Sequence, residues 1–195
     1  MKNLKRLFTT YDVKGTKNYL NSQKKYEVIR TILYFGISLS LFFAGILTTH
    51  TRKNLLTLVA VLGCLPASKS LIGTFMFLRY KSLPMEMADK IEAHVGNLFS
   101  LYDCVFTSTN KNFEVGHLVI RGNTIAGLYT KKKYAETDCE KHLNVYLKAD
   151  GYKDVTVKIF SDEKKYIERI DQMRQLPEDK KLTEGIAETL KSIAL

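Results

Sequence analysis

Residues Thr31–Leu78 read TILYFGISLSLFFAGILTTHTRKNLLTLVAVLGCLPASKSLIGTFMFL, which is two long apolar runs around a short polar turn. The runs, Thr31–Thr49 and Asn54–Leu78, each reach the roughly 20 residues that an α-helix needs to cross the hydrocarbon core of a bilayer. Only His50–Lys53 separate the runs, so the two helices are expected to turn back on each other. The sequence therefore predicts a membrane α-helical hairpin.

Basic residues lie mostly before and after this predicted hairpin. Eight Lys or Arg precede Thr31, two more (Arg52 and Lys53) lie in the turn, and Arg79 and Lys81 follow the second run. Since Lys and Arg beside membrane spans stay on the cytoplasmic side, the chain is predicted to be a multi-pass protein of the cell membrane with both termini cytoplasmic. A cleaved signal peptide fits poorly, because the polar region before Thr31 has 30 residues and no small-x-small cleavage site follows the apolar run.

The net charge of +10 is unevenly distributed along the 195 residues. Met1–Arg79 holds 12 basic and two acidic residues, whereas Tyr80–Leu195 holds 18 of each. A nucleic-acid-binding domain usually concentrates its excess Lys and Arg in the folded module, so nucleic acid is not an expected partner, whereas the lipid bilayer is. The predicted parts are a basic juxtamembrane leader over residues 1–30, the hairpin over 31–79 and a cytoplasmic α/β domain over 80–195.

Two patterns in the membrane part each have two interpretations. The first is a set of apolar residues at helical spacing among the lysines of the leader: Leu4, Leu7, Phe8 and Tyr11. It suits a short helix on an anionic inner leaflet, and a disordered basic leader is the alternative. The second is a set of small residues at every fourth position of the two runs: Gly36, Ser40, Ala44, Thr48, Ala60, Cys64 and Ser68. Small side chains let helices approach closely, either within the hairpin or in a homodimer.

The second apolar run is interrupted by Pro66 and Lys69. Pro66 lacks a backbone donor and is expected to kink the helix. Lys69 lies nine residues before the end of the run, about 13 Å of helix, which is beyond easy snorkelling. An intramembrane charge is a functional hypothesis by default, and a Lys that snorkels or faces the kink is the alternative.

After Leu83 the pattern changes to that of a soluble α/β domain. Apolar residues at helical or alternating spacing, bounded by turn residues, predict the elements in order. These are a helix over Pro84–Leu98, strands over Ser100–Thr109, Phe113–Ile120 and Thr124–Thr130, a helix over Tyr134–Ala149, a strand over Asp154–Phe160, and helices after Ser161 and around Thr183–Ala194. The predicted fold class is a membrane helical hairpin plus an α/β domain of α-β-β-β-α-β order with a mixed sheet.

Two of these strands carry a partial motif: Val115–Ile120 reads VGHLVI and Leu128–Lys131 reads LYTK. With the order of elements, they resemble the restriction-endonuclease-like (PD-(D/E)xK) superfamily and its NERD-type nuclease-related domains over Pro84–Phe160. The resemblance implies an Asp on the second strand and a Glu-x-Lys on the third, which hold a divalent metal that activates water. The Asp position falls on Gly116 and the Glu position on Tyr129, so both metal ligands are missing, while the Lys is retained as Lys131.

The degenerate motif favours a non-catalytic domain without a metal or cofactor. Glu114 lies two residues before Gly116 and should point to the same face of the strand, so Glu114 and Lys131 are the residues left for a magnesium-dependent nuclease. The predicted function is therefore binding of a protein partner, or of a second copy, at the inner membrane face. A membrane-tethered nuclease is one alternative, and a small transport-associated subunit using Lys69 is another.

The other candidate residues are predicted to be mainly structural. Lys131, Lys132 and Lys133 form a basic cluster that is either a solvated strand–helix junction or a contact to lipid head groups or a partner. His117 lies among apolar strand residues, where a lone His is usually part of the core. The three cysteines, Cys64, Cys104 and Cys139, are scattered, which fits small core residues in a reducing setting and neither a disulfide framework nor zinc.

Overall fold

The computed structural model describes residues 14–51, 53–131 and 133–195, so the predicted leader helix lies outside the described residues. The chain divides into two compact units. The first contains Leu20–Tyr80, and the second combines the short segment that ends at Tyr19 with Lys81–Leu195. The hairpin is therefore inserted into the chain of the second unit, to which it is connected at both ends.

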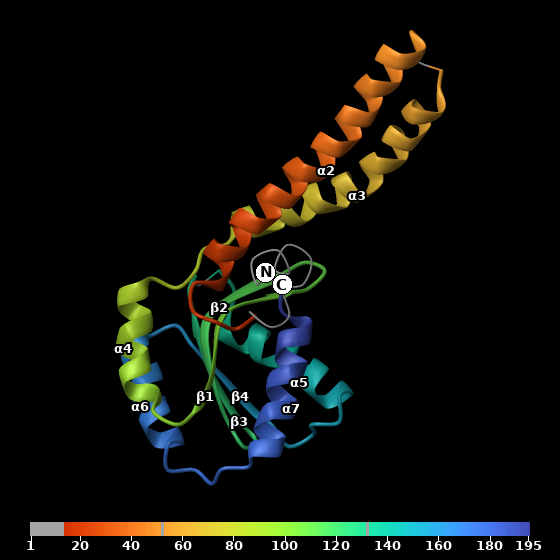
Figure 1. Ribbon diagram of the computed structural model, residues 1–195. Coiled ribbons are helices and arrows are strands. Elements are labelled where there is room, and N and C mark those ends of the chain that lie inside the picture. The colour runs from red at the N-terminus through yellow and green to blue at the C-terminus, as the bar shows by residue number, and fades with distance from the viewer. Residues whose placement is uncertain (1–13, 52, 132) are drawn as a thin grey trace. The chain divides into compact units, whose positions relative to one another are not determined.

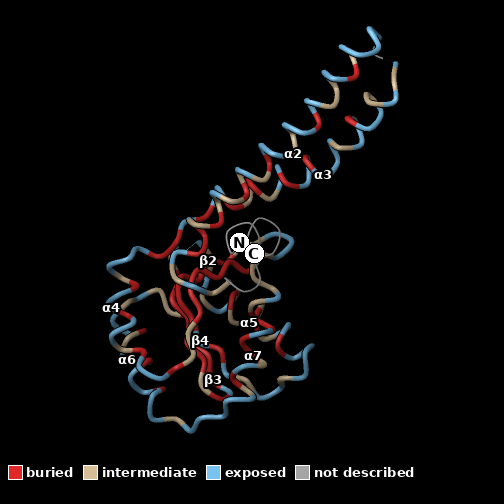
Figure 2. The backbone as a smooth tube through the Cα atoms, in the orientation of Figure 1, coloured by how far each residue is buried: buried red, intermediate tan, exposed pale blue. Residues whose placement is uncertain are grey.

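The first unit is a pair of long helices, α2 (Tyr19–Thr49) and α3 (Leu55–Arg79). Helix α2 begins at Tyr19, well before the apolar run, and α3 begins at the N-cap Asn54 and continues through Pro66. Both helices are long and apolar enough to cross a membrane, and only 17% of the most apolar window of each is buried. Figure 2 shows them exposed along most of their outer faces, unlike the core helices of a soluble protein.

Small residues at every seventh position run along the buried face of the hairpin, which on α3 also includes Ser70 and Phe77. On α2 they are Thr31, Ser38 and Gly45, and on α3 they are Ala60, Ala67 and Thr74. A seven-residue repeat stays on one side of two helices that wrap around each other, whereas a four-residue repeat drifts away from it. The prediction that the every-fourth stripes pack within the hairpin was therefore wrong except at Ala60, because the other members are exposed: Gly36, Ser40, Ala44, Thr48, Cys64 and Ser68.

The hairpin register can be tested by a disulfide between Ser38→Cys and Gly63→Cys in a Cys64→Ser background. A Cβ at position 63 would lie 3.7 Å from the Cβ of Ser38, which suits a disulfide. We expect mild oxidation of the full chain in membranes to protect both thiols from a maleimide reagent until reduction. The control pair, Gly36→Cys with Gly63→Cys, should stay reactive, since nothing lies within 4 Å of a Cβ at position 36. Equal protection of both pairs would contradict the register.

The second unit is a three-layer α/β domain around a four-stranded sheet of order β1-β2-β3-β4. The first three strands are antiparallel neighbours, and β4 is parallel to β3. Helices α4 and α6 cover one face and α5 and α7 the other (Figure 1). The elements are α4 (Met85–Val95), β1 (Phe99–Thr107), β2 (Asn112–Arg121), β3 (Thr124–Tyr129), α5 (Glu136–Ala149), β4 (Thr156–Phe160), α6 (Glu163–Met173) and α7 (Lys180–Ile193). A helical region followed by an α/β domain with a mixed sheet is thus confirmed.

Alternating side chains of β2 build both layers of the core. Val115, Leu118 and Ile120 pack towards α5 and α7, whereas Val119 packs towards α4 and α6. The alternation is interrupted at Gly116, where the pairing register between β2 and β3 shifts. This bulge decides which strand residues share a face, and it therefore positions the candidate site.

The outer edge of β1 is covered by segments from far apart in the chain. The amide of Tyr102 donates to the carbonyl of Gly15 at 2.8 Å, and the amide of Leu195 donates to the carbonyl of Val105 at 2.9 Å. The Lys14 ammonium donates to the carbonyl of Ala194 at 2.7 Å and so joins the two covering segments. Gly15 can make this contact because its φ is +80° and a side chain there would overlap Leu101.

Candidate functional site

The structure brings together two of the four positions singled out by the nuclease-like motif. The Lys131 ammonium lies 3.6 Å from the Glu114 carboxylate, whose side chain is 15% exposed. Lys131 is half-exposed, so this ion pair adds little stability. Glu114 and Lys131, the two residues left for a nuclease, therefore lie side by side as an ion pair.

The other two positions, Gly116 and Tyr129, point to opposite faces of the sheet. A Cβ at Gly116 would overlap Thr130 Oγ1 at 2.5 Å and Leu83 Cδ1 at 2.8 Å, and Leu83 belongs to the core layer under α4 and α6. Tyr129 pairs with Val115 in the register and packs beside Cys139, in the layer under α5 and α7. Acids at these two positions would be separated by the sheet, so they would not hold one metal ion together.

The basic cluster after β3 is only partly described. Lys131 pairs with Glu114, Lys133 lies 5.4 Å from the centre of the Tyr134 ring, and Lys132 lies outside the described residues. In the described part of the chain, no group of three or more His, Cys, Asp or Glu side chains is arranged to hold a metal ion. Contact of the Lys131–Lys133 cluster with lipid head groups or a partner stays a prediction.

His117 is the centre of a buried aromatic cluster. It has no exposed surface, its Nδ1 lies 2.7 Å from the Tyr166 hydroxyl, and its ring lies 4.4 Å from the Tyr102 ring. Burial, with a smaller contribution from the charge of Lys17, lowers the pKa of His117 to about 3. The imidazole is therefore neutral at physiological pH, and it shares a buried hydrogen bond with the Tyr166 hydroxyl.

The cysteines are unsuited to nucleophilic chemistry in the α/β domain. Cys104 and Cys139 are buried, and burial is the largest cause that raises the pKa of each thiol to about 12. Both are thus protonated at neutral pH, whereas the thiolate is the nucleophilic form. Cys64 is exposed on α3.

A buried polar network joins α2 to α3, and sequence reasoning missed it. Its members are Gln23, Glu27, Arg30, Thr31, Ser70 and Thr74. The Arg30 guanidinium pairs with the Glu27 carboxylate and donates through Nε to Ser70 Oγ at 3.3 Å. The hydroxyl of Thr31 lies 2.8 Å from those of Ser70 and Thr74. Opposite charges three residues apart, just before the apolar run, were the available sequence signal.

This network also fixes the level of Lys69 along the hairpin. Since Thr31 contacts both Ser70 and Thr74, Lys69 lies within about one helical turn (~5 Å) of the level where the first apolar run begins. Its side chain is exposed on the outer face of α3, not in the buried network. The depth of about 13 Å, counted along α3 from the end of its apolar run, stays a prediction.

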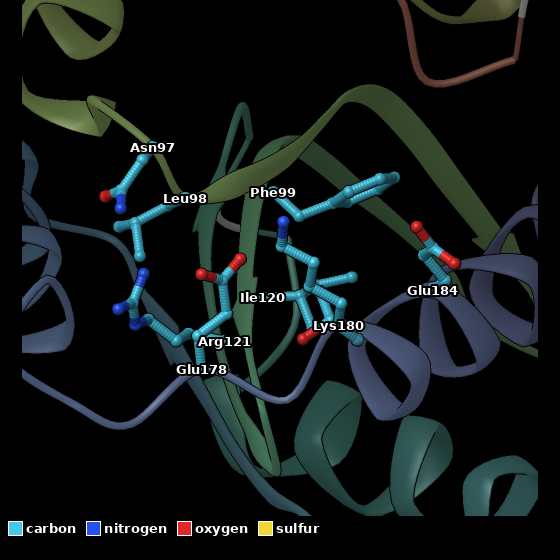
Figure 3. Close-up of a pocket in the computed structure, with 9 residues that line it drawn as sticks. Asn97, Leu98, Phe99, Ile120, Arg121, Glu178, Lys180 and Glu184 are labelled. Carbon is cyan, nitrogen blue, oxygen red and sulfur yellow. The ribbon is translucent and has the colours of Figure 1, made fainter.

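A hollow of 290 Å³ lies at the end of the sheet where β1 begins and β2 ends. Figure 3 shows Arg121, Glu178, Lys180 and Glu184 around it. Arg121 is held by a 2.6 Å hydrogen bond from Nε to the carbonyl of Leu176. The lining therefore carries two cations, Arg121 and Lys180, and two anions, Glu178 and Glu184.

Comparisons of the chain with protein-family models, with curated proteins and with solved structures find no match.

Proposed function

We propose that this chain is a membrane-anchored binding protein whose α/β domain holds a protein partner at the cytoplasmic face of the cell membrane. The observation that carries the proposal is the exposed apolar surface of α2 and α3, which extends over the outer faces of both helices. Apolar surface of this extent is stable in lipid and not in water. The first apolar run has 19 residues, about 28 Å of helix, which matches the hydrocarbon thickness.

The arrangement of polar groups supports binding over catalysis. Gly116 and Tyr129 face opposite sides of the sheet, His117 is enclosed and neutral, and the buried thiols are protonated. Catalysis needs a nucleophile or base within reach of a reacting group in an accessible pocket. A second copy of this chain is the alternative partner, through the outward stripe of small residues on α2.

The anchor and its topology can be tested with reporters in membranes. A cytoplasmic reporter fused after Leu195 should be active, and the same reporter inserted after Thr51 in the turn should be inactive, because positive charge keeps both termini inside. The chain should also resist extraction by alkaline carbonate. Extraction into the soluble fraction, or activity of the turn fusion with loss of the C-terminal one, would reject the proposal.

A membrane-tethered nuclease is the second candidate, favoured by the contact between Glu114 and Lys131. We expect no cleavage of DNA or RNA by the purified full chain with Mg²⁺ or Mn²⁺, since one carboxylate does not hold a catalytic magnesium. The Gly116→Asp/Tyr129→Glu variant should gain no activity, because its acids would lie on opposite faces. Metal-dependent cleavage that disappears in Glu114→Gln and Lys131→Ala would establish the nuclease instead.

A transport-associated subunit has less support. It depended on a charge deep in the bilayer, and Lys69 lies close to the level of Thr31. A Lys at that level can extend to the interface by snorkelling.

A further inference from the structure

We propose that the free edge of β4 and the groove beside it bind an extended acidic segment of the protein partner, which joins the sheet as a fifth strand. The groove, here the α5–β4 groove, is lined by Lys141, Asn144, Val145, Lys148, Lys153 and Val155 and has a volume of 530 Å³. The inference rests on the proposed binding function and names the surface and the chemistry of the partner.

The two outer edges of the sheet differ in whether other segments of the chain pair with them. The β1 edge accepts and donates backbone hydrogen bonds with Gly15 and Leu195, so it has no room for another strand. No described strand pairs with the outer edge of β4, because β4 ends the sheet. An edge strand presents a row of backbone donors and acceptors, which is the surface that an added peptide strand uses.

The backbone groups on the free edge of β4 can be assigned from its pairing with β3. The amide of Thr156 donates to the carbonyl of Asn123 at 2.8 Å, so Thr156 and Lys158 direct their backbone groups towards β3. Val157 and Ile159 therefore direct theirs outwards. The Ile159 amide is occupied by the carboxylate of Glu140 at 3.0 Å, which confirms this direction.

Glu140 acts as a removable cover on the edge. It reaches the Ile159 amide from α5 and lies 3.4 Å from the Lys158 ammonium. Val157 and Ile159 point towards α5, so the side chain of Lys158, which lies between them in the strand, starts on the opposite face of the sheet. The ion pair of Lys158 with Glu140 on α5 therefore passes across the outer edge of β4. Charged side chains at an edge protect against unwanted strand pairing. A single hydrogen bond from the Ile159 amide to a side chain is replaced by a peptide more easily than the row of backbone hydrogen bonds between two paired strands.

The groove beside this edge has the charge and apolar surface for an acidic peptide. Lys141, Lys148 and Lys153 have no acidic partner within 4 Å in the described part of the chain. Val145 lies between them with 66% of its surface exposed. An added strand would direct alternate side chains towards α5, where glutamates would meet the lysines and an aliphatic side chain would cover Val145. The backbone donors and acceptors at the edge favour a peptide over a lipid surface or a nucleic acid.

The test measures binding of a fluorescent ten-residue peptide of alternating Glu and Val to the full chain in phosphatidylcholine nanodiscs. We expect saturable binding, and a loss of about tenfold in affinity for Lys148→Glu/Lys153→Glu, since each reversal replaces an attraction by a repulsion. The matched variant Lys164→Glu/Lys165→Glu on α6 should bind like the parent chain. Glu140→Ala should bind severalfold more tightly, because the Ile159 amide is then open.

Three controls make the outcome decisive. The same peptide with every backbone amide N-methylated keeps its charge and cannot pair as a strand, so equal binding would overturn the edge pairing. An equal loss in the α6 variant, or displacement of the peptide by single-stranded DNA or by anionic vesicles, would overturn the acidic-peptide assignment. Absence of binding with the anchor and topology intact would reject this site alone, whereas a chain extracted as a soluble protein would reject the proposed function.

Discussion

Lowering the pH from 7 to 4 should destabilise the α/β domain by about 3 kcal/mol through His117 alone. Burial lowers the pKa of this imidazole to about 3 in the folded chain, against about 6.5 in the unfolded chain. Between these values the unfolded chain binds a proton that the folded chain does not. The contribution of His117 to the free energy of unfolding is therefore fully present above pH 6.5, and it falls by about 1.4 kcal/mol per pH unit below that value.

The environment of His117 explains why it stays neutral. The ring is fully buried, and its hydrogen-bond partner is the equally buried Tyr166 hydroxyl. Tyr166→Phe should cost about 1–3 kcal/mol at pH 7, because Nδ1 is left buried without its hydrogen-bond partner. Replacing both groups, as His117→Leu/Tyr166→Phe, removes the pair and keeps most of the volume, so it should cost less than the single change.

The measurement is denaturant unfolding of the full chain in detergent between pH 4 and 7. The double variant should lose most of the pH dependence, since the titrating group is gone. His94→Gln is the control, because His94 is 43% exposed and pairs with Asp171 at the surface. Retention of the full dependence in the double variant would show that another group is responsible.

Arg30→Leu is expected to have a comparably large effect on the hairpin, about 3 kcal/mol. The Glu27 side chain is 4% exposed, so loss of the guanidinium leaves a carboxylate buried against Gly73 and Gln23 without a countercharge. The double change Glu27→Leu/Arg30→Leu should recover most of the loss, because it removes both charges together.

Lys69→Leu is the matched control for Arg30→Leu. It removes a cation from nearly the same level of the hairpin, but from the exposed side of α3, and should change stability by less than about 0.5 kcal/mol. The readout is unfolding in detergent, followed by fluorophores placed one on each helix. A larger loss in Lys69→Leu than in Arg30→Leu would contradict the assignment of the buried network.

Local patterns predicted the elements well, because they depend on neighbours in sequence. The apolar, β-branched run Phe113–Ile120 predicted β2, the length of the apolar runs predicted α2 and α3, and the order of elements predicted a mixed sheet. Boundaries shifted where a polar segment continued an apolar helix, as at Tyr19, since tertiary packing stabilises a helix beyond its apolar run.

What sequence patterns missed depends on register. The level of Lys69 relative to α2 depends on the contact of Thr31 with Ser70. The buried face of the hairpin follows a seven-residue repeat and not the expected four-residue one. The faces of Gly116 and Tyr129 depend on which residues pair across β2 and β3, and a bulge changes that pairing by one residue. The α5–β4 groove likewise combines residues of α5 with Lys153 and Val155, and only the folded structure shows that they lie side by side.

The segment around Gly15 has a consequence for how the chain is made. It leaves the ribosome before the hairpin, yet its partner Tyr102 is synthesised only after both long helices, and the bond from Lys14 to Ala194 spans 180 residues. The α/β domain therefore cannot close its β1 edge during synthesis of the hairpin and must wait until translation has reached Leu195. Such distant contacts make folding slow, and the β1 edge of the nascent chain stays open until they form.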